Sequence, residues 1–348
     1  MNSNGKDVKI SCRNVWKVYG DEPDQFFNNG NGDVPDNQSI YKAMTDTGHI
    51  GAACNVSFEV YTGEIFIIMG LSGSGKSTMV RCLSRLVEPT AGEVLLDGED
   101  LLKIGEEDLI EIRRHKMGMV FQNFGLLPHL TVLENISFPL KVQGVDLQAR
   151  EQKAMEVIKL VGLEGREDSF PRQLSGGQQQ RVGIARSLVV EPELWFLDEP
   201  FSALDPLIRR QMQDEFLRLQ KMLHKTIVFI THDFLEALRL ADRIAIMKDG
   251  EVVQIGTPAQ LVLNPADDYV AEFTKDVPRV RVITAGEIAD NTRSAEGLNS
   301  QVSGDATLED IMPLFNAHPD GVEVMDGEKS LGVATPQSVV NALAVSQD

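Results

Sequence analysis

The sequence predicts an α/β fold with a mainly parallel core sheet, flanking helices and a small C-terminal α+β module. Short apolar runs recur along the chain, and each closes on a polar residue. Runs that are apolar on every side are typical of strands buried on both faces of a parallel sheet. At 348 residues the chain exceeds one typical domain, so we expect a second, smaller one. The four clearest runs are residues 65–69, 119–121, 194–197 and 227–230.

The other elements follow in chain order. Residues 8–19 are expected to form an opening strand, and residues 20–50, rich in Gly, Asn, Asp and Pro, an irregular insertion. Residues from about 120 to 175 have a helical pattern without a comparable buried strand, which predicts a helical subdomain. Asp249-Gly250 is a strong signal for a tight hairpin. We place a domain boundary near Asp276–Pro278, which gives domains 1–277 and 278–348.

The composition excludes several classes of protein. A net charge of −19 disfavours binding to nucleic acid and to anionic lipid, because like charges repel. No apolar run reaches the roughly 18 residues that span a bilayer, and the first residues lack the apolar core of a secretory signal. The cysteines at 12, 54 and 82 show no metal-binding spacing, which favours a reducing cytosol.

Gly70–Ser77, read GLSGSGKS, matches the phosphate-loop pattern G-x-x-x-x-G-K-[ST]. Glycines let backbone N–H groups turn toward phosphate oxygens, and the following helix adds its positive dipole end. Lys76 can then reach the β- and γ-phosphates, and the Ser77 hydroxyl can coordinate Mg²⁺. A chance glycine-rich turn is the alternative, and the preceding apolar run disfavours it.

Asp198 and Glu199 close the run at 194–197. Adjacent residues on a strand point in opposite directions, so we expect two different roles. Asp198 is placed to hold Mg²⁺ through water, and Glu199 to act as the general base for the attacking water. Two solvated carboxylates at a strand end would be the alternative if the pair stood alone.

Gln122 and His232 also follow buried runs, at 119–121 and 227–230. Each is a weak signal alone, because a glutamine there is usually polar surface and a histidine usually structural. Because the carboxyl ends of parallel strands share one edge, all four runs predict a single site. Gln122 would contact Mg²⁺ and the attacking water. His232 would bind the γ-phosphate and orient Glu199, which suits the positioning chemistry of phosphoryl transfer.

Leu174–Gln178, read LSGGQ, opens a further predicted helix. Ser175, Gly176 and Gly177 would present free N–H groups at its start, a second anion site. Since Gly70–Ser77 already binds the chain's own nucleotide, this second site is expected to face the nucleotide of another copy. An ordinary serine-capped helix is the alternative.

Together these motifs resemble the ATP-binding subunit of an ABC (ATP-binding cassette) transporter, over residues 8–275. The resemblance implies an ATP-hydrolysing homodimer that uses ATP and Mg²⁺. It further implies two transmembrane permease subunits, an extracytoplasmic solute-binding protein, no nucleic-acid partner, and a peripheral location on the cytoplasmic face of the inner (plasma) membrane.

The resemblance also implies roles residue by residue. Tyr19 takes the place of the aromatic residue that stacks on adenine, and Asp205 closes the loop 202–205 that links the two sites. Ser77, Gln122 and Asp198 would serve the metal, and Lys76, Gln122, Glu199 and His232 the catalysis. The nucleotide would further contact Gly70, Leu71, Ser72, Gly73, Ser74, Gly75, Lys76, Ser77, Thr78, Ser175, Gly176, Gly177 and Gln178.

Longer strings around residues 69–98, 201–215 and 264–273 resemble ATPases of quaternary amine importers, for glycine betaine, proline betaine or choline. Such subunits often carry C-terminal CBS modules, and residues 305–343 fit one copy, in which Ser338 replaces a common acidic ribose-binding residue. An importer of another small solute, such as an amino acid, is an alternative. A soluble ABC ATPase uncoupled from transport is the alternative from another class.

Overall fold

The computed structural model describes residues 7–27, 36–121, 125–275, 277–298, 300–327 and 329–344. The chain divides into two compact units, 1–253 and 254–348, which are considered separately. Within the described ranges, no helix is both long and apolar enough to cross a membrane.

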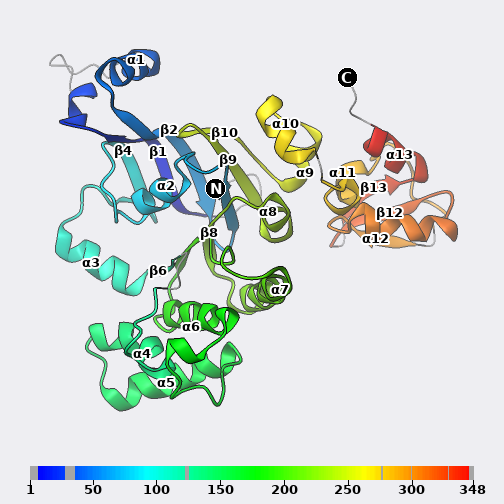
Figure 1. Cartoon of the computed structure of the whole chain (residues 1–348). Coiled ribbons are helices and arrows are strands. Elements are labelled where there is room, and N and C mark those ends of the chain that lie inside the picture. The colour runs from blue at the N-terminus through cyan, green and yellow to red at the C-terminus, as the bar shows by residue number, and fades with distance from the viewer. Residues whose placement is uncertain are drawn as a thin grey trace. The chain divides into compact units, whose positions relative to one another are not determined.

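A six-stranded sheet forms the core of the first unit, in the order β10-β9-β3-β8-β7-β6 (Figure 1). Strands β6, β7, β8, β3 and β9 pair in parallel, as predicted. Every residue of β3, β7 and β8 is buried, which explains why these runs are apolar on all sides. The bounds are β3 Ile65–Met69, β6 Met117–Val120, β7 Leu194–Asp198, β8 Thr226–Thr231, β9 Arg243–Lys248 and β10 Glu251–Gly256.

The turn between β9 and β10 is the predicted Asp249-Gly250 pair. Both residues have positive φ, 49° and 85°, as a type I′ hairpin turn requires.

A second, antiparallel sheet has the order β2-β1-β4-β5. Its two long strands pair so that Tyr19, the last residue of β1, faces Ile50, the first residue of β2. Helix α2 packs against both strands and against β7 and β8 of the core sheet. The bounds are β1 Val8–Tyr19, β2 Ile50–Tyr61, α2 Lys76–Leu83, β4 Ala91–Leu96, β5 Glu99–Asp100 and α3 Glu106–His115.

The segment 20–50 is more ordered than we predicted. It contains a short 3-10 helix, Pro23–Phe26, and an eleven-residue helix, α1, Asn37–Thr47. Asp36 caps α1 by accepting a hydrogen bond from the Ser39 N–H, and Gly48 ends it with φ 71°. The irregular prediction was wrong here because the polar composition hid a helix that buries only Ile40 and Met44.

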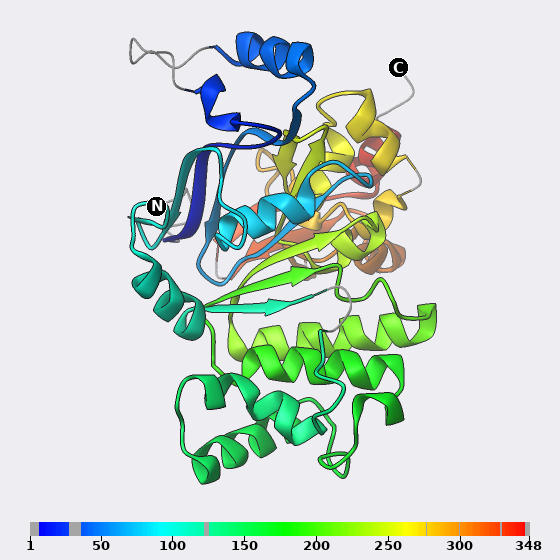
Figure 2. The same ribbon diagram turned by 60° about the vertical axis from the view of Figure 1, so that its left-hand side comes forward.

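Helices fill the stretch in which a helical pattern was predicted, and the group continues through α6 (Figure 2). Thr131 and Glu134 form a capping box that starts α4. Helices α4, α5 and α6 pack on one another, and α6 also packs on β6 and α7. The bounds are α4 Val132–Val142, α5 Leu147–Leu160, α6 Gly176–Leu188, α7 Pro206–Leu223 and α8 Phe234–Leu240.

The second unit has a three-stranded sheet, β11-β12-β13, in which β11 is parallel and β13 antiparallel to β12. The predicted boundary at 277–278 falls inside this unit, after α10. Its core contains Ile283, Leu308, Ile311, Val322, Val324 and Val339. The bounds are α9 Pro258–Leu263, α10 Asp268–Thr274, α11 Ala285–Ile288, β11 Gln301–Ser303, α12 Leu308–Ile311, β12 Val322–Asp326, β13 Lys329–Ala334 and α13 Pro336–Ala344.

Candidate nucleotide-binding and catalytic site

The phosphate loop connects β3 to α2, and its backbone explains its glycines. Gly70 and Gly75 both have positive φ, 154° and 95°. A Cβ at Gly70 would lie 2.2 Å from the Met247 carbonyl oxygen, and one at Gly75 would lie 2.0 Å from the Ala52 carbonyl oxygen. Neighbouring backbone therefore contacts the loop at both glycines, and a side chain at either position would displace the loop backbone.

Lys76, the first residue of α2, is buried within this loop. Its Nζ donates hydrogen bonds of 2.9 Å to the carbonyl oxygens of both Gly70 and Leu71. Burial lowers the pKa of the Lys76 ammonium, and the nearby carboxylates of Glu199 and Asp198 oppose that shift. The ammonium is thus held against the loop backbone, where an anionic phosphate would stabilise its charged form.

Asp198 ends β7 beside the start of α2. The Ser77 hydroxyl donates a 3.1 Å hydrogen bond to Asp198 Oδ1. Burial raises the pKa of Asp198, whereas the Ser77 hydrogen bond and the positive Arg81 oppose the rise. A hydroxyl and a carboxylate side by side are oxygen ligands of the kind that Mg²⁺ takes together with nucleotide phosphates. The donor set at Ser77 and Asp198 therefore fits the expected metal.

We expected Asp198 and Glu199 to point in opposite directions as neighbours on one strand. Glu199 instead lies just after the last residue of β7, so the alternation of side chains along the strand does not set the direction of its side chain. Its φ of 46° places it in the left-handed region, which is uncommon for a residue with a side chain and often marks functional sites. Its N–H donates to the Ile230 carbonyl at 3.1 Å. The Ser202 hydroxyl also donates a hydrogen bond to the Glu199 carbonyl oxygen. The turn at Glu199, held by these two hydrogen bonds, therefore sets the direction of the carboxylate.

His232 follows β8 and meets this carboxylate. Its Nδ1 lies 3.1 Å from Glu199 Oε2. The Glu199 side chain is 17% exposed and that of His232 60% exposed, so Glu199 is partly buried and His232 is open to solvent. The remaining ring nitrogen of His232 is free of this contact and can bind a substrate oxygen.

Gln122 lies outside the described residues, between β6, which ends at Val120, and Gly125. Its predicted role with the metal and the attacking water stays a prediction.

The LSGGQ motif starts α6 as a capping box. Ser175 Oγ accepts from the Gln178 N–H at 3.3 Å, and Gln178 Oε1 accepts from the Ser175 N–H at 3.0 Å. A Cβ at Gly177 would lie 2.6 Å from Ile208 Cγ2, so this glycine lets α6 approach α7 closely. Figures 1 and 2 show α2 and α6 on opposite sides of the core sheet. The motif therefore starts a helix remote from the chain's own phosphate loop.

Tyr19 lies at the end of β1 with 45% of its surface exposed. The Lys17 ammonium lies 5.1 Å from the centroid of its ring. An exposed ring at the edge of the antiparallel sheet is available for stacking on a base.

Asp205 caps α7, where its Oδ1 accepts from the Ile208 N–H at 3.1 Å. One residue of α7 that sequence reasoning missed is Arg209. Its Nε donates to the Phe201 carbonyl at 3.2 Å and its Nη2 to the Leu204 carbonyl at 3.1 Å, and Nη1 lies 3.6 Å from Asp233. Arg209 thus joins the loop after Glu199 to the loop after His232. No sequence pattern marks an arginine whose partners are backbone carbonyls.

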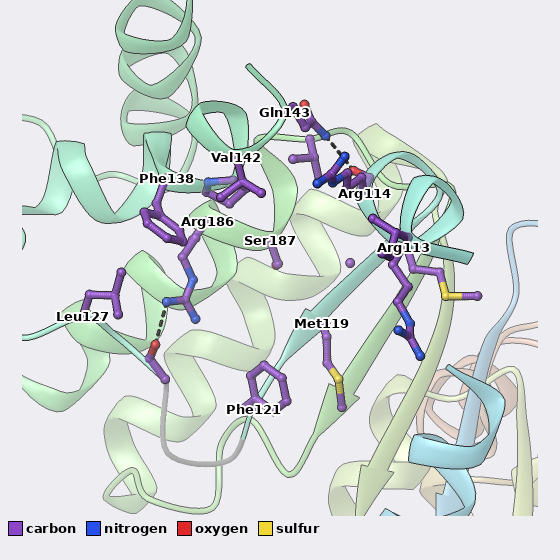
Figure 3. A pocket seen from close by; sticks show the side chains of 16 residues that line it. Arg113, Arg114, Met119, Phe121, Leu127, Phe138, Val142, Gln143, Arg186 and Ser187 are labelled. Atoms are coloured by element: carbon purple, nitrogen blue, oxygen red, sulfur yellow. Dashed lines mark hydrogen bonds between the residues drawn. The ribbon is translucent and has the colours of Figure 1, made fainter. Parts of the chain in front are cut away.

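A pocket of about 500 Å³ lies between β6, α3, α4 and α6 (Figure 3). Phe121, Leu127, Phe138 and Val142 give it apolar walls. At its edge the Arg186 guanidinium donates to the Gly125 carbonyl at 2.6 Å. The pocket adjoins both ends of the segment that contains Gln122.

Comparison with known proteins supports this assignment. A family model described as ABC transporter matches residues 53–202. The chain is 52% identical to the trimethylamine N-oxide transport system ATP-binding protein TmoW of Pelagibacter ubique, over 97% of this chain and 98% of that protein. It is 44% identical to the glycine betaine/proline betaine transport system ATP-binding protein ProV of Escherichia coli, over 98% and 84%.

The fold also matches a solved dimeric structure of the ATP-binding cassette MJ0796, bound to ADP and Pi, in a post-hydrolysis state. The TM-score is 0.59 at 36% identity, over 71% of this chain and 98% of that one. The predicted family is confirmed: this chain belongs to the ATP-hydrolysing, ATP-binding subunits of ABC transporters.

Proposed function

We propose that this chain is the ATPase of an ABC importer for small solutes with a fully substituted, positively charged nitrogen, such as trimethylamine N-oxide and glycine betaine. The observation that carries the proposal is the alignment with TmoW, which runs over 98% of that protein at 52% identity and so includes the C-terminal unit. An ABC cassette alone would account for similarity up to about residue 275.

Uptake in the source cell tests this proposal. Deletion of the gene should abolish accumulation of radiolabelled trimethylamine N-oxide, glycine betaine or both, and the wild-type chain should restore it. A chain with Glu199→Gln should not. Glycine, which carries no methyl group on its nitrogen, is the matched control solute. Unchanged uptake of both methylated solutes in the deletion strain would contradict the proposal.

In the catalytic cycle we infer, the phosphate loop would hold the triphosphate, and Ser77 and Asp198 would hold Mg²⁺. The metal would neutralise charge on the phosphates. Glu199 takes the proton of the attacking water while His232, 3.1 Å away, keeps the carboxylate oriented. The geometry supports these roles because side chains from the ends of three neighbouring strands, β3, β8 and β7, converge there.

A homodimer is proposed for two reasons. Helix α6, which LSGGQ starts, lies across the core sheet from α2, and this supports a role for LSGGQ at the nucleotide of a second chain. The MJ0796 cassette, which this fold matches, is dimeric in its ADP-bound structure. ATP would close two chains and hydrolysis would release them.

We further propose that the pocket beside Phe121 receives a segment of a permease subunit on the cytoplasmic face of the membrane. Its apolar walls support this, and so do Phe121 and Gly125 in its lining, which are the described residues on either side of the segment that contains Gln122. Phe138, 37% exposed, is the residue to alter. Phe138→Asp should abolish solute uptake and leave the ATPase activity of the isolated chain largely unchanged. Normal uptake by this variant would contradict the docking role.

For residues 278–348, the part of the second unit that follows α10, we propose a single CBS-like module that tunes the transporter. The order β11-α12-β12-β13-α13 supports this, as does the core that these elements share. Thr335 caps the last helix, since its Oγ1 accepts from the Ser338 N–H at 3.1 Å, and the Ser338 hydroxyl accepts in return from the Thr335 N–H at 2.7 Å. Truncation after Asp276 should preserve ATP hydrolysis in the assembled transporter while altering its salt dependence. Loss of hydrolysis by a folded truncate would show that the segment after Asp276 belongs to the catalytic part.

A further inference from the structure

The inserted segment begins and ends beside the proposed base site. Tyr19 precedes it and Ile50 follows it, and the two residues are directly paired across β1 and β2. Directly opposed residues of antiparallel strands project to the same face. Tyr19 is 45% and Ile50 67% exposed, so the two residues that flank the insertion form an exposed pair of apolar side chains.

The strand that begins at Ile50 runs next to the phosphate loop. The carbonyl of Ala52, two residues after Ile50, contacts Gly75 so closely that a Cβ there would lie 2.0 Å from it. Helix α2, which starts at Lys76, packs against both β1 and β2. A nucleotide whose phosphates occupy the loop would therefore extend its base toward this strand pair.

The opposite face of the same strands is fixed by the insertion itself. Trp16 and Val18 of β1 form a buried cluster with Phe26, Ile40 and Met44 of the inserted segment. The Trp16 ring also contacts the rings of Phe27 and Tyr41, with centroids 5.5 Å and 5.4 Å away. The strand that carries Tyr19 is thus packed on its back face by residues of the insertion.

His49 joins the two ends of the insertion. One ring nitrogen, Nε2, lies 2.8 Å from the Asp21 carbonyl oxygen, and Nδ1 lies 2.8 Å from Thr47 Oγ1. The ring also occupies the space beside Gly20, where a Cβ would lie 2.1 Å from His49 Cδ2. Gly20 and His49 are the immediate neighbours of Tyr19 and Ile50, so this contact sets the spacing of the exposed pair.

We propose that the insertion completes the base-binding subsite: Ile50 and Tyr19 form a paired platform for the adenine ring, and His49 is a positioning residue that holds the pair. The inference rests on the proposed base-stacking role of Tyr19. Burying the Ile50 side chain against a flat aromatic base removes apolar surface from water, which favours a nucleoside triphosphate over a bare polyphosphate.

Two ligands separate the base from the phosphates. Binding of ATP and of inorganic tripolyphosphate to the full chain is measured by calorimetry in EDTA, which prevents hydrolysis. Ile50→Ser should weaken ATP about fivefold to tenfold, the scale of one buried aliphatic side chain. Tripolyphosphate affinity should change less than about twofold. Leu147→Ser, at a 57% exposed leucine on α5, is the matched control and should change neither affinity.

His49 is tested by kinetics. His49→Ala should raise the KM for ATP several-fold with little change in kcat, and His49→Gln, whose amide can still donate to the Asp21 carbonyl, should recover part of the loss. A purely structural role would instead weaken tripolyphosphate binding as well.

Three outcomes overturn the inference and are distinguishable. If Tyr19→Ala weakens ATP but Ile50→Ser does not, the base stacks on Tyr19 without help from the insertion. If Ile50→Ser weakens both ligands equally, its effect passes through the phosphate loop. If neither Ile50→Ser nor Tyr19→Ala changes ATP binding, the base site itself lies elsewhere.

Discussion

Replacing Arg209 should slow hydrolysis without weakening ATP binding. Its guanidinium donates to carbonyl oxygens of Phe201 and Leu204 in the loop that follows Glu199, and faces Asp233 beside His232. Arg209→Ala removes both of these charged donors. Hydrogen bonds from a charged group contribute about 1.5–3 kcal/mol each when buried.

The expected loss is smaller than that sum. The Arg209 side chain is 31% exposed, so water can replace part of what is removed, and the ion pair with Asp233 at 3.6 Å is partly screened. Because the two loops would be held less precisely, we expect the activation free energy to rise by about 2 kcal/mol, which corresponds to roughly a 30-fold fall in kcat. Arg209→Lys should recover little of the lost activity, because an ammonium cannot reproduce the fixed, planar donors of a guanidinium.

Steady-state ATPase assays of the purified chain measure this effect, with the KM for ATP as the second readout. Arg210, the exposed neighbour on the same helix, provides the matched control, and Arg210→Ala should have near-normal kcat. A normal kcat for Arg209→Ala would refute the proposal that the Arg209 guanidinium links the two loops. A fall in kcat that Arg209→Lys fully restores would refute it as well.

Four other predictions follow from the same geometry. Glu199→Gln should bind ATP but hydrolyse it at least about 10²-fold more slowly, the scale of general-base catalysis, as single-turnover assays would show; near-normal turnover would contradict its role. Lys76→Ala should weaken ATP binding or abolish turnover, and unchanged values for both would contradict the phosphate-loop assignment. Ser175→Arg should leave ATP binding largely intact and block hydrolysis, and mixed dimers with Lys76→Ala should recover activity at one composite site; complete inactivity of every mixture would favour a role within one chain or obligatory coupling of both sites. Lys9→Met should destabilise the chain by about 1–3 kcal/mol in urea unfolding, because Lys9 is buried and bridges Asp97 and Glu193; an unchanged midpoint would show that water replaces both contacts.

The core sheet could be predicted because its strands are buried on both faces. The runs at 65–69, 194–197 and 227–230 are apolar throughout, and the polar residue after each marks the sheet edge where Asp198 and His232 lie. The hairpin at 249–250 could be predicted because two positive φ angles require a pair such as Asp-Gly. In each case one local constraint is strong enough to appear in the sequence.

Other features depend on tertiary contacts that leave no local pattern. Helix α1 buries only Ile40 and Met44, so few apolar residues mark it, and the surrounding Asn, Asp and Gly dominate the composition. Glu199 is aimed by a left-handed turn held by the Ile230 carbonyl, which lies on a different strand. Arg209 binds carbonyls, which every residue possesses.

The charges of the site explain why nucleotide and metal should bind together. Asp198 and Glu199 lie near one ammonium, Lys76, whose own charged form is disfavoured by burial. A triphosphate added to this arrangement would bring further negative charge beside two carboxylates, and the N-terminal dipole of α2 offsets only part of it. Ser77 and Asp198 would hold a divalent cation, whose positive charge would reduce this repulsion. The cation would also neutralise the buried carboxylate of Asp198, whose pKa is raised by burial, so nucleotide and metal would each lower the free-energy cost of binding the other.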